Sequence, residues 1–364
     1  MKQRSLAAKI FLLPCSKLYG AVTYMRNKFF DWKFLKEVEF DVPTISVGNI
    51  AVGGTGKTPL AEYIIGHFLE KGLRVASLSR GYRRKTSGFV LAGKHSTPFD
   101  IGDESFQVYN KFNGKVLVAV CEDRVQGIRE LLRIDPKIDI IILDDAFQHR
   151  YVRPTVSIVV SEYSRPIYSD AMLPYGRLRE PARGINRADI LVISKCPPQL
   201  TPWAYREVIN NYGLQPYQQL FFSRFAYQPL QPVFPDMVSA VPYLDWLDKG
   251  DTLLIVAGIG NPKPFVRQIR SFGVKVKVDV FPDHHQYTKK DLEYILQRFN
   301  QMQGNRKFIV TTEKDAVRLA TNPYYPHELR ASTFFLPIKM EFDYTHETPA
   351  FEDTLDKLLR ERTK

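Results

Sequence analysis

Apolar residues in the first half of the chain come in short runs that are separated by longer amphipathic segments. Each run is apolar at consecutive positions, which is typical of a strand buried on both faces of a parallel sheet. The runs cover residues 44–47, 75–79, 116–120, 138–143, 156–160 and 190–193. The segments between them carry apolar residues at helical spacing. This alternation predicts an α/β fold, a doubly wound and mostly parallel sheet with helices on both faces.

The pattern changes between residues 215 and 242, where the chain is rich in Pro, Gln and aromatic residues, as in "QPLQPVFPDMVSAVP". Proline cannot continue a helix, so this stretch predicts a connector or a hairpin. A second α/β pattern follows, with strands expected at 252–258, 274–281 and 308–312 and helices after Pro262 and Thr288. Thr288 with Asp291, and Thr312 with Asp315, have the spacing of a helix capping box. We therefore predict one domain at 37–222 and a smaller α/β domain at 223–364 that closes over the first.

Composition adds one feature to this picture, a basic N-terminal segment at 1–36. The chain of 364 residues has a net charge of +12. In this segment Asp31 is opposed by eight basic residues, Lys2, Arg4, Lys9, Lys17, Arg26, Lys28, Lys33 and Lys36. Its apolar runs are broken well before the roughly 20 residues that a spanning helix needs. Basic and aromatic residues mixed on one helix predict an amphipathic segment on an anionic membrane surface. A helix packed on the first domain is the alternative, and a cleavable signal peptide is disfavoured because no small-x-small site clearly follows the apolar run.

The cysteines indicate a reducing compartment. Cys15, Cys121 and Cys196 are far apart and show neither a CxxC motif nor a Cys/His spacing. This argues against a disulfide framework and against a structural zinc site.

A glycine cluster follows the first predicted strand in "TISVGNIAVGGTGKTPLAEYIIGHF". Its core matches the phosphate-binding pattern G-x-x-x-x-G-K-[ST] except at the first position, which is alanine. The pattern is aligned with Ala51, Val52, Gly53, Gly54, Thr55, Gly56, Lys57 and Thr58, the expected phosphate-binding residues. In such a loop backbone N–H groups, an ammonium and a hydroxyl surround the phosphates at a helix N-terminus. Strand, loop and helix stand in the required order, which favours a nucleotide site over a chance glycine turn.

A second element of a nucleotide site is expected at "IDIIILDDAFQHR". Asp144 and Asp145 end an apolar strand, at the sheet edge where α/β proteins bind ligands. Gln148 and His149 follow directly, and a strand cap does not need so many polar residues. We expect at least one of the two acids to contact a metal ion, and a purely structural role is the alternative.

Several segments together resemble the tetraacyldisaccharide 4′-kinases, membrane-associated P-loop enzymes of lipid A biosynthesis in Gram-negative bacteria. Besides the glycine loop and "LDDAFQHR", these are "SRGYRR", "GDES", "MLPYGRLREP", "AGIGNP", "FPDHHQYT" and "TTEKDAVRL". They occur in family order from residue 46 to residue 319. The joint set is specific, whereas each segment alone is weak.

The resemblance implies a P-loop kinase that transfers the γ-phosphoryl group of ATP to the 4′-hydroxyl of a tetraacyldisaccharide 1-phosphate, with Mg²⁺. The expected partners are this acylated disaccharide phosphate and the anionic inner membrane, at its cytoplasmic face, and no nucleic acid. The implied catalytic residues are Asp103 as the proton acceptor, His284 as its partner, Lys57 and Asp145. The expected metal contacts are Thr58, Asp144, Glu104 and Gln148. The expected substrate contacts are Arg80, Arg179, Glu180 and His149.

Each of these roles has an alternative that the residues alone leave open. Asp103 could cap a helix that starts near Glu104. His284 and His285 could be surface residues or a metal pair, although adjacent residues diverge. The arginines of "SRGYRR" could form a solvated basic face, or contact phosphate.

Two other classes of function are considered. A P-loop GTPase of the metallochaperone kind is suggested by "VISKCP", which follows a strand as a guanine-binding motif would. Pro197 stands where that motif needs an aspartate, which argues against guanine recognition. A nucleic-acid-binding protein is suggested by the basic charge and by the 13% aromatic content. The excess charge lies mainly in the N-terminal segment, which argues against this class.

Overall fold

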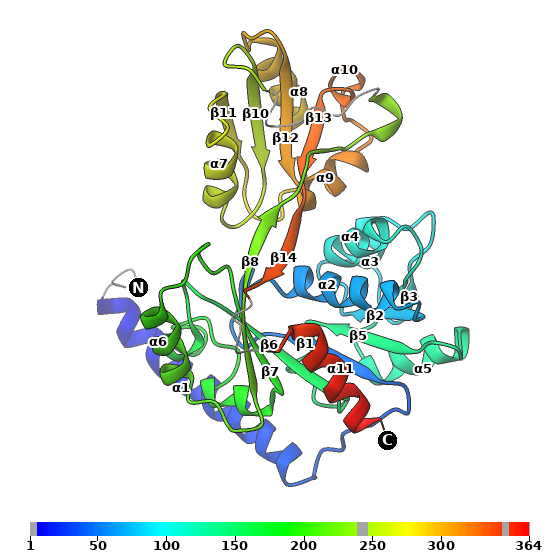
Figure 1. Cartoon of the computed structure of the whole chain (residues 1–364), viewed down its shortest axis with the longest axis vertical. Helices are drawn as coiled ribbons and strands as arrows, with labels where there is room; N and C mark the ends of the chain where they lie inside the picture. Colours follow the sequence, from blue (N-terminus) through cyan, green and yellow to red (C-terminus); the bar gives the residue numbers. More distant parts are fainter. Residues whose placement is uncertain (1–5, 239–246, 344–348, 364) are drawn as a thin grey trace.

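The computed structural model describes residues 6–238, 247–343 and 349–363, with side chains from residue 11 onward. Two sheets build the molecule, one in each of two lobes (Figure 1). Expectations that concern Lys2 and Arg4, and the side chain of Lys9, lie outside the described residues.

The larger sheet has nine strands in the order β14-β8-β7-β6-β1-β5-β2-β4-β3. Strands β8 to β4 of this order are parallel to one another, and the two edge strands β14 and β3 are antiparallel to their neighbours. All six strands predicted for this region are present. The bounds are β1 Thr44–Gly48, β2 Val75–Ser79, β3 Val90–Leu91, β4 Leu117–Val120, β5 Ile140–Asp144, β6 Val156–Glu162, β7 Ile190–Ser194, β8 Gln219–Tyr227 and β14 Ile338–Phe342.

Helices cover both faces of this sheet, which explains why its strands are apolar at consecutive positions. On β5, Ile140 and Ile142 pack in one core cluster, whereas Ile141 and Leu143 pack in another on the opposite face. The first cluster includes residues of α2 (Lys57–Glu70), α4 (Asp103–Lys111) and α11 (Phe351–Arg362). The opposite face is covered by α5 (Arg124–Ile134) and α6 (Pro202–Tyr212), together with the short helix η2 (Ala182–Arg187). The short helices α3 (Pro98–Ile101) and η1 (Ile167–Ser169) lie in connections.

The smaller sheet has five strands in the order β11-β10-β12-β13-β9, of which only β9 is antiparallel to its neighbour. Its strands are β9 Gln231–Pro232, β10 Thr252–Ala257, β11 Lys275–Val280, β12 Lys307–Thr312 and β13 Thr333–Leu336. Its helices are η3 Pro235–Met237, α7 Lys263–Arg270, α8 Lys289–Asn300, α9 Glu313–Ala320 and α10 His327–Arg330. The strands and helices expected here are present. The capping box of Thr288 and Asp291 is formed. At Thr312 the side chain accepts from Asp315 N, and the Asp315 carboxylate accepts from Gly258 N and from the Thr312 hydroxyl.

The connection between the lobes differs from the predicted division. β8 was expected to be part of a connector or hairpin, but it is a nine-residue strand of the larger sheet, and the proposed boundary at 222/223 falls inside it. β14 returns antiparallel to β8, so two neighbouring strands run between the lobes (Figure 1). The last helix, α11, then packs on the larger sheet. The segment assigned to 223–364 therefore contributes to both lobes.

The basic N-terminal segment forms one helix, α1 (Leu6–Asp31), which lies along the lower edge of the large lobe (Figure 1). One side of α1 contacts the lobe: Ser16 Oγ donates to the Met172 carbonyl, and the Tyr19 hydroxyl to the Arg179 carbonyl. The other side exposes apolar residues, among them Phe11 and Leu18. Among the described residues, no helix is both long enough and apolar enough to cross a bilayer.

Candidate active site

The glycine loop joins β1 to the N-terminus of α2, as the sequence pattern requires. Gly53 and Gly56 have positive φ angles of 116° and 95°, which side chains rarely adopt. Gly53 and Gly54 are exposed, so a phosphate can approach their backbone closely. Thr55 is buried, and its hydroxyl accepts a hydrogen bond of 2.8 Å from Asn49 Nδ2. The loop is therefore held from behind and open in front.

A second segment, the 171–180 loop, fastens the glycine loop from the side. Val52 N donates to the Arg177 carbonyl at 2.8 Å, and Arg179 N donates to the Ile50 carbonyl at 2.7 Å. Ala51 sits between these bonds in an antiparallel bridge with Leu178. "RLREP" thus shapes the glycine loop through its backbone, a role that spacing in the sequence does not reveal.

Lys57 and Arg179 both face the carboxylate of Asp145. Lys57 Nζ lies 3.5 Å from Asp145 Oδ1, and Arg179 Nη1 lies 3.0 Å from the same oxygen. Asp145 has a positive φ of 50°, a conformation that aspartate tolerates better than most residues. Burial would raise the pKa of Asp145, but the charges of Lys57 and Arg179 lower it overall. Asp145 is therefore ionised, and it holds the loop lysine in place.

Asp144 has the features of a metal ligand. It ends β5, it is buried, and its Oδ2 accepts a hydrogen bond of 3.3 Å from the Thr58 hydroxyl. Its Oδ1 is buried without a hydrogen-bond partner. Burial first, and then the charge of Glu104, raise the pKa of Asp144 to about 7. An orphaned carboxylate oxygen beside a P-loop hydroxyl fits Mg²⁺, which prefers oxygen ligands.

The described residues contain no group of three or more His, Cys, Asp or Glu side chains arranged to hold a metal ion. A P-loop magnesium site does not depend on such a group, because Mg²⁺ keeps several waters and binds phosphate oxygens beside one or two protein ligands.

Asp103 and Glu104 begin α4, and the preceding Gly102 is its N-cap. Asp103 is therefore the first residue of the helix and not its N-cap, so the capping hypothesis is wrong. Gly102 has φ 82°, and a Cβ there would lie 2.8 Å from the Tyr82 carbonyl oxygen, so glycine is needed where "SRGYRR" passes the helix start. Glu104 pairs with Lys314 Nζ of α9 at 2.8 Å. Burial would raise the pKa of Glu104, but Lys314, and Lys57 more weakly, lower it. Glu104 thus lies within the electrostatic reach of the loop lysine.

Asp103 meets two residues of the smaller lobe. His284 Nδ1 lies 3.3 Å from Asp103 Oδ2, and Arg318 Nη2 lies 2.6 Å from the same oxygen. Burial would raise the pKa of Asp103, but the hydrogen bond to His284 and the charge of Arg318 lower it to about 2. The expected pairing of Asp103 with His284 across the lobes is present. Arg318 is an additional member that the sequence analysis missed.

The two adjacent histidines diverge. His284 has a positive φ of 59°, and its backbone N–H donates to the Gly258 carbonyl. His285 instead stacks on Phe281 and contacts Asp291 Oδ2 through Nε2 at 3.0 Å. A metal pair of His284 and His285 is therefore excluded.

Glu180, an expected substrate contact, is engaged within the protein. It is buried, Oε1 accepts from Gln148 Nε2, and Oε2 accepts from Asn27 and Arg187. Gln148, an expected metal contact, is also hydrogen-bonded within the protein. Its Nε2 donates to the Asn49 carbonyl at 2.7 Å, and its Oε1 lies 3.4 Å from Arg179 Nη1, next to a cation. Both side chains link α1 and the 171–180 loop to the base of the glycine loop.

His149 and Arg80 occupy different environments. His149 Nε2 accepts a hydrogen bond of 3.3 Å from Arg124 N at the start of α5. Burial, and then the charge of Arg124, lower the pKa of His149 to about 4, so it is neutral. His149, an expected substrate contact, thus supports the start of α5. Arg80 is exposed, and no hydrogen bond or ion pair to it is found among the described residues. Arg124, a further basic residue that the sequence analysis missed, is buried with an unpartnered Nε.

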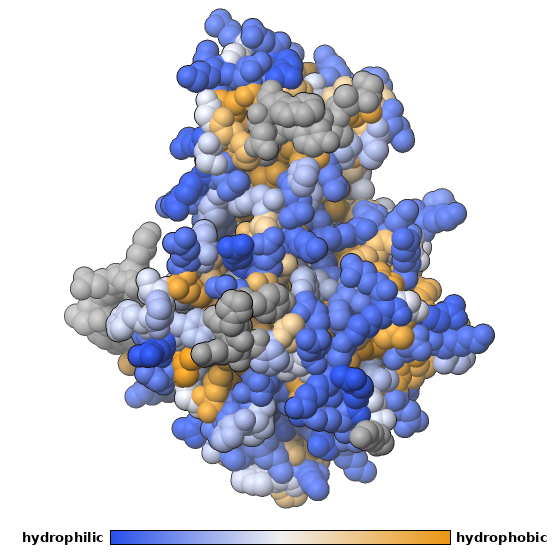
Figure 2. Space-filling view, viewed as in Figure 1, coloured by the Kyte–Doolittle hydropathy of each residue, from blue (hydrophilic) through white to orange (hydrophobic). Residues whose placement is uncertain are grey.

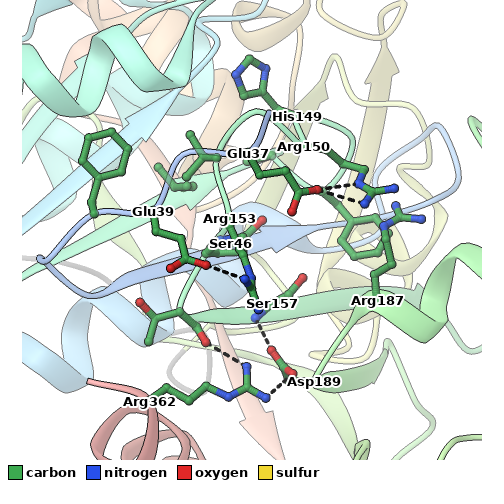
Figure 3. Close-up of a pocket in the computed structure, with 17 residues that line it drawn as sticks. Glu37, Glu39, Ser46, His149, Arg150, Arg153, Ser157, Arg187, Asp189 and Arg362 are labelled. Carbon is green, nitrogen blue, oxygen red and sulfur yellow. Dashed lines mark hydrogen bonds and ion pairs between the residues drawn. The ribbon is translucent and has the colours of Figure 1, made fainter. Parts of the chain in front are cut away.

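A separate polar cavity of about 660 Å³ lies on the face of the larger sheet opposite α2 (Figure 3). Ser46 and Ser157 are part of its lining. Several charged residues around it pair with one another, as Arg150 does with Glu37 and Arg362 does with Asp189 (Figure 3). None of the glycine-loop residues lines it.

Comparison with protein families identifies the family of the chain. Residues 8–360 match the family model of the tetraacyldisaccharide-1-P 4′-kinases. The chain belongs to this family. The match covers the glycine loop, the Asp103–His284–Arg318 cluster and the returning segment that contains β14.

Related proteins span the same length. The chain is 43% identical to the tetraacyldisaccharide 4′-kinase of Bacteroides thetaiotaomicron, covering 97% of this chain and 94% of the relative. It is 41% identical to that of Flavobacterium johnsoniae, with 91% and 92% covered. The crystal structure of LpxK from Aquifex aeolicus in complex with ATP superposes with a TM-score of 0.72 at 29% identity, covering 97% and 98% of the two chains.

Proposed function

We infer that this chain is a tetraacyldisaccharide 4′-kinase, which transfers the γ-phosphoryl group of ATP to the 4′-hydroxyl of a tetraacyldisaccharide 1-phosphate. The family match over almost the whole chain supports this reaction. Family membership also favours the kinase over the metallochaperone GTPase alternative.

One observation carries the proposal: the phosphate-binding residues lie near Asp103, the ionised carboxylate that is expected to accept the hydroxyl proton. Lys57 and Asp145 act electrostatically on Glu104, and Glu104 is adjacent to Asp103 at the start of α4. Phosphoryl transfer is mostly a matter of positioning the acceptor and neutralising charge on the phosphate. In this site Asp103 can position the acceptor hydroxyl, and Lys57 can neutralise charge on the phosphate.

The roles of the residues follow from their contacts. The backbone N–H groups from Gly53 to Gly56 bind the phosphates, and Lys57 neutralises charge on the oxygens of the transferred group. Thr58 and Asp144 are the residues that would hold Mg²⁺, which supplies charge neutralisation when it is bound. Asp103 accepts the hydrogen bond, and then the proton, of the sugar hydroxyl.

The substrate phosphate is assigned to the basic residues near the start of α4. Arg80 is exposed and carries no partner of its own among the described residues, and arginine binds phosphate through several N–H donors. Arg179 is already engaged with Asp145 at 3.0 Å, so its contribution is to orient that carboxylate.

Transfer of label tests the function. The full chain is incubated with γ-labelled ATP and a panel of monophosphorylated acyl disaccharides, and lipid-bound label is followed. We expect label on the lipid and a preference for ATP over GTP. Nucleotide hydrolysis without lipid labelling would overturn the proposal.

Binding of the magnesium nucleotide is expected to depend on pH through Asp144. Below its pKa of about 7 this carboxyl is protonated, and a proton must leave before the oxygen can hold a cation. The affinity for MgADP should therefore fall by about tenfold from pH 8 to pH 6. Titration calorimetry in buffers of different ionisation enthalpy measures both affinity and proton release.

The matched control for this measurement is Asp144→Asn. The nucleotide's own phosphates titrate in the same range, and the variant retains that contribution while it lacks the carboxyl. A pH dependence that is identical in wild type and variant would contradict the assignment of Asp144.

We propose in addition that α1 binds an anionic membrane surface, at the cytoplasmic face of the inner membrane. Phe11, Leu18 and Val22 are 74%, 69% and 60% exposed, although they are large and apolar. Figure 2 displays one face of the molecule, on which apolar residues form scattered patches within a mostly polar surface. Apolar side chains beside basic ones suit the headgroup layer.

Replacing the exposed apolar residues of α1 is expected to weaken membrane binding. The variant Phe11→Ser, Leu18→Ser, Val22→Ser removes side chains whose burial is worth about 1.5 kcal/mol or more each. Co-sedimentation with vesicles that contain anionic lipid should fall by at least about tenfold. Arg26 is left intact, because its Nη2 donates to the Gln148 carbonyl and its loss would disturb the site.

A matched triple variant in the smaller lobe controls for lost surface hydrophobicity. Val280, Tyr294 and Tyr324 are also large and exposed, at 56%, 46% and 60%, and their replacement by serine should leave vesicle binding unchanged. Equal losses in both triple variants, or no loss in the α1 variant, would favour a helix that only packs on the lobe.

A further inference from the structure

The guanidinium of Arg318 forms hydrogen bonds to both lobes at their boundary. Arg318 lies on α9 of the smaller lobe, and its side chain is 2% exposed. Nε and Nη2 donate to Asp103 Oδ2 at 3.1 and 2.6 Å. Nη1 donates to Asp315 Oδ1 at 2.9 Å and to the Gly258 carbonyl at 3.2 Å. This group is therefore fixed by its own lobe and holds a carboxylate of the other lobe.

The surroundings of Arg318 are rigid. Asp315 is fully buried, and its Oδ2 accepts from Gly258 N at 2.9 Å and from the Thr312 hydroxyl at 2.7 Å. A Cβ at Gly258 would lie 3.0 Å from Asp315 Oδ1, so "AGIGNP" supplies glycine where the carboxylate packs. The orientation of Arg318 thus follows from the ends of β10 and β12 rather than from a flexible loop.

The contacts divide the two oxygens of Asp103 between two tasks. Both arginine bonds and the His284 contact converge on Oδ2. Within the described part of the chain, no hydrogen bond to Oδ1 is found. Oδ1 is thus the oxygen that can accept from an incoming hydroxyl.

Arg318 also limits what His284 can do. Arg318 Nη2 lies 3.2 Å from His284 Nδ1, and arginine has only donor hydrogens. His284 Nδ1 can therefore accept from Arg318 or donate to Asp103, but it cannot do both at once. The hydrogen bonds from Arg318 to Asp103 do not depend on which nitrogen of His284 carries the proton.

We propose that Arg318 is a positioning residue of phosphoryl transfer, which fixes Asp103 Oδ2 from the smaller lobe so that Oδ1 receives the acceptor hydroxyl. The inference rests on the proposed kinase function. It assigns to "TTEKDAVRL" the task of completing the active site of the larger lobe. The acceptor hydroxyl is therefore aligned only when the two lobes are packed together, because Arg318 and Asp103 come from different lobes.

Arg318→Gln is expected to lower kcat by about 10²-fold with little change in KM for either substrate, because a misplacement of about 1 Å has effects of that size. Arg318→Lys, which retains one charged donor, should recover part of this loss. In an Asp103→Asn background, Arg318→Gln should cost little more, since a residue that acts through Asp103 has nothing left to position. Melting temperatures are measured for every variant.

The matched control is Arg298→Gln, which breaks another arginine–aspartate pair of the smaller lobe, with Asp279, at 3.2 Å. It should leave kcat near that of wild type. If Arg318→Gln fails to fold because Asp315 is left buried and unpaired, the double variant Asp315→Asn, Arg318→Gln neutralises both partners and replaces it.

Three results would overturn the inference. They are an unchanged kcat in Arg318→Gln, an effect of Arg318→Gln on KM alone, or an equal decrease in kcat when Arg318→Gln is added to the wild type and to Asp103→Asn. A wild-type protein that labels no lipid would instead refute the proposed function, so the two failures are distinguishable.

Discussion

Lys57→Ala is expected to abolish most phosphoryl transfer while leaving the fold intact. The variant removes the ammonium that neutralises charge on the transferred group, and a loss of about 10²–10⁴ in kcat is the scale for such a contact. The loop itself should still form, because Ser194 and the 171–180 loop bond its backbone and Asn49 bonds the Thr55 hydroxyl. Asp145 also keeps its partner Arg179 when Lys57 is lost.

The measurement is steady-state transfer with the melting temperature as a check on folding. Lys71→Ala is the matched control, because Lys71 lies just after α2 and its partner Asp356 is on α11, away from the phosphates. Near-normal kcat in Lys57→Ala would exclude the glycine loop as the site of transfer.

The second large effect is expected at Asp103 and His284, which should behave as one unit. Asp103→Ala removes the acceptor of the hydroxyl proton, and a loss of about 10²–10⁴ in kcat is expected. His284→Ala should be severe as well. The double variant should cost little more than the worse single variant, because the two side chains meet at 3.3 Å and share Arg318.

His285→Ala is the control for the double-mutant cycle. His285 is the neighbouring residue, but it contacts Asp291 and Phe281 instead of Asp103. Its kcat should stay near that of wild type, and KM should change little in the Asp103 and His284 variants. Fully additive losses would show that His284 acts independently of Asp103.

Local features explain why much of this site can be predicted from the sequence. The strands of the larger sheet are buried on both faces, so Ile140 to Leu143 read as an uninterrupted apolar run. The glycine loop is a contiguous stretch whose spacing is set by the phosphate it binds. Asp144 and Asp145 follow a strand end, which places them at the binding edge of the sheet.

The lobe boundary is harder to predict because it depends on a pairing between distant segments. Arg224 on β8 contacts Glu341 on β14, 117 positions away. β8 lies in a stretch rich in Pro and Gln, and its outer half is only partly buried, so it lacks the apolar signature of the inner strands. Nothing local indicates that β14 and α11 return to the larger sheet.

The roles of Glu180 and Arg318 could not be predicted for the same reason. Glu180 is an acid in a segment rich in arginine, and only its burial against Asn27 and Gln148 reveals a supporting role. Arg318 is separated from Asp103 by 215 positions. Its motif is part of the family resemblance, but the contact with Asp103 exists only after the lobes pack.

The position of the newly transferred phosphate tests the central claim most directly. The full chain is incubated with ATP, Mg²⁺ and a tetraacyldisaccharide 1-phosphate, and the lipid product is analysed by mass spectrometry and phosphorus NMR. The account predicts a bisphosphorylated lipid with its new phosphate on the 4′-oxygen, formed at least about 10²-fold more slowly by Lys57→Ala. Release of inorganic phosphate with GTP preferred and the lipid unchanged, or a phosphate at another position, would contradict it.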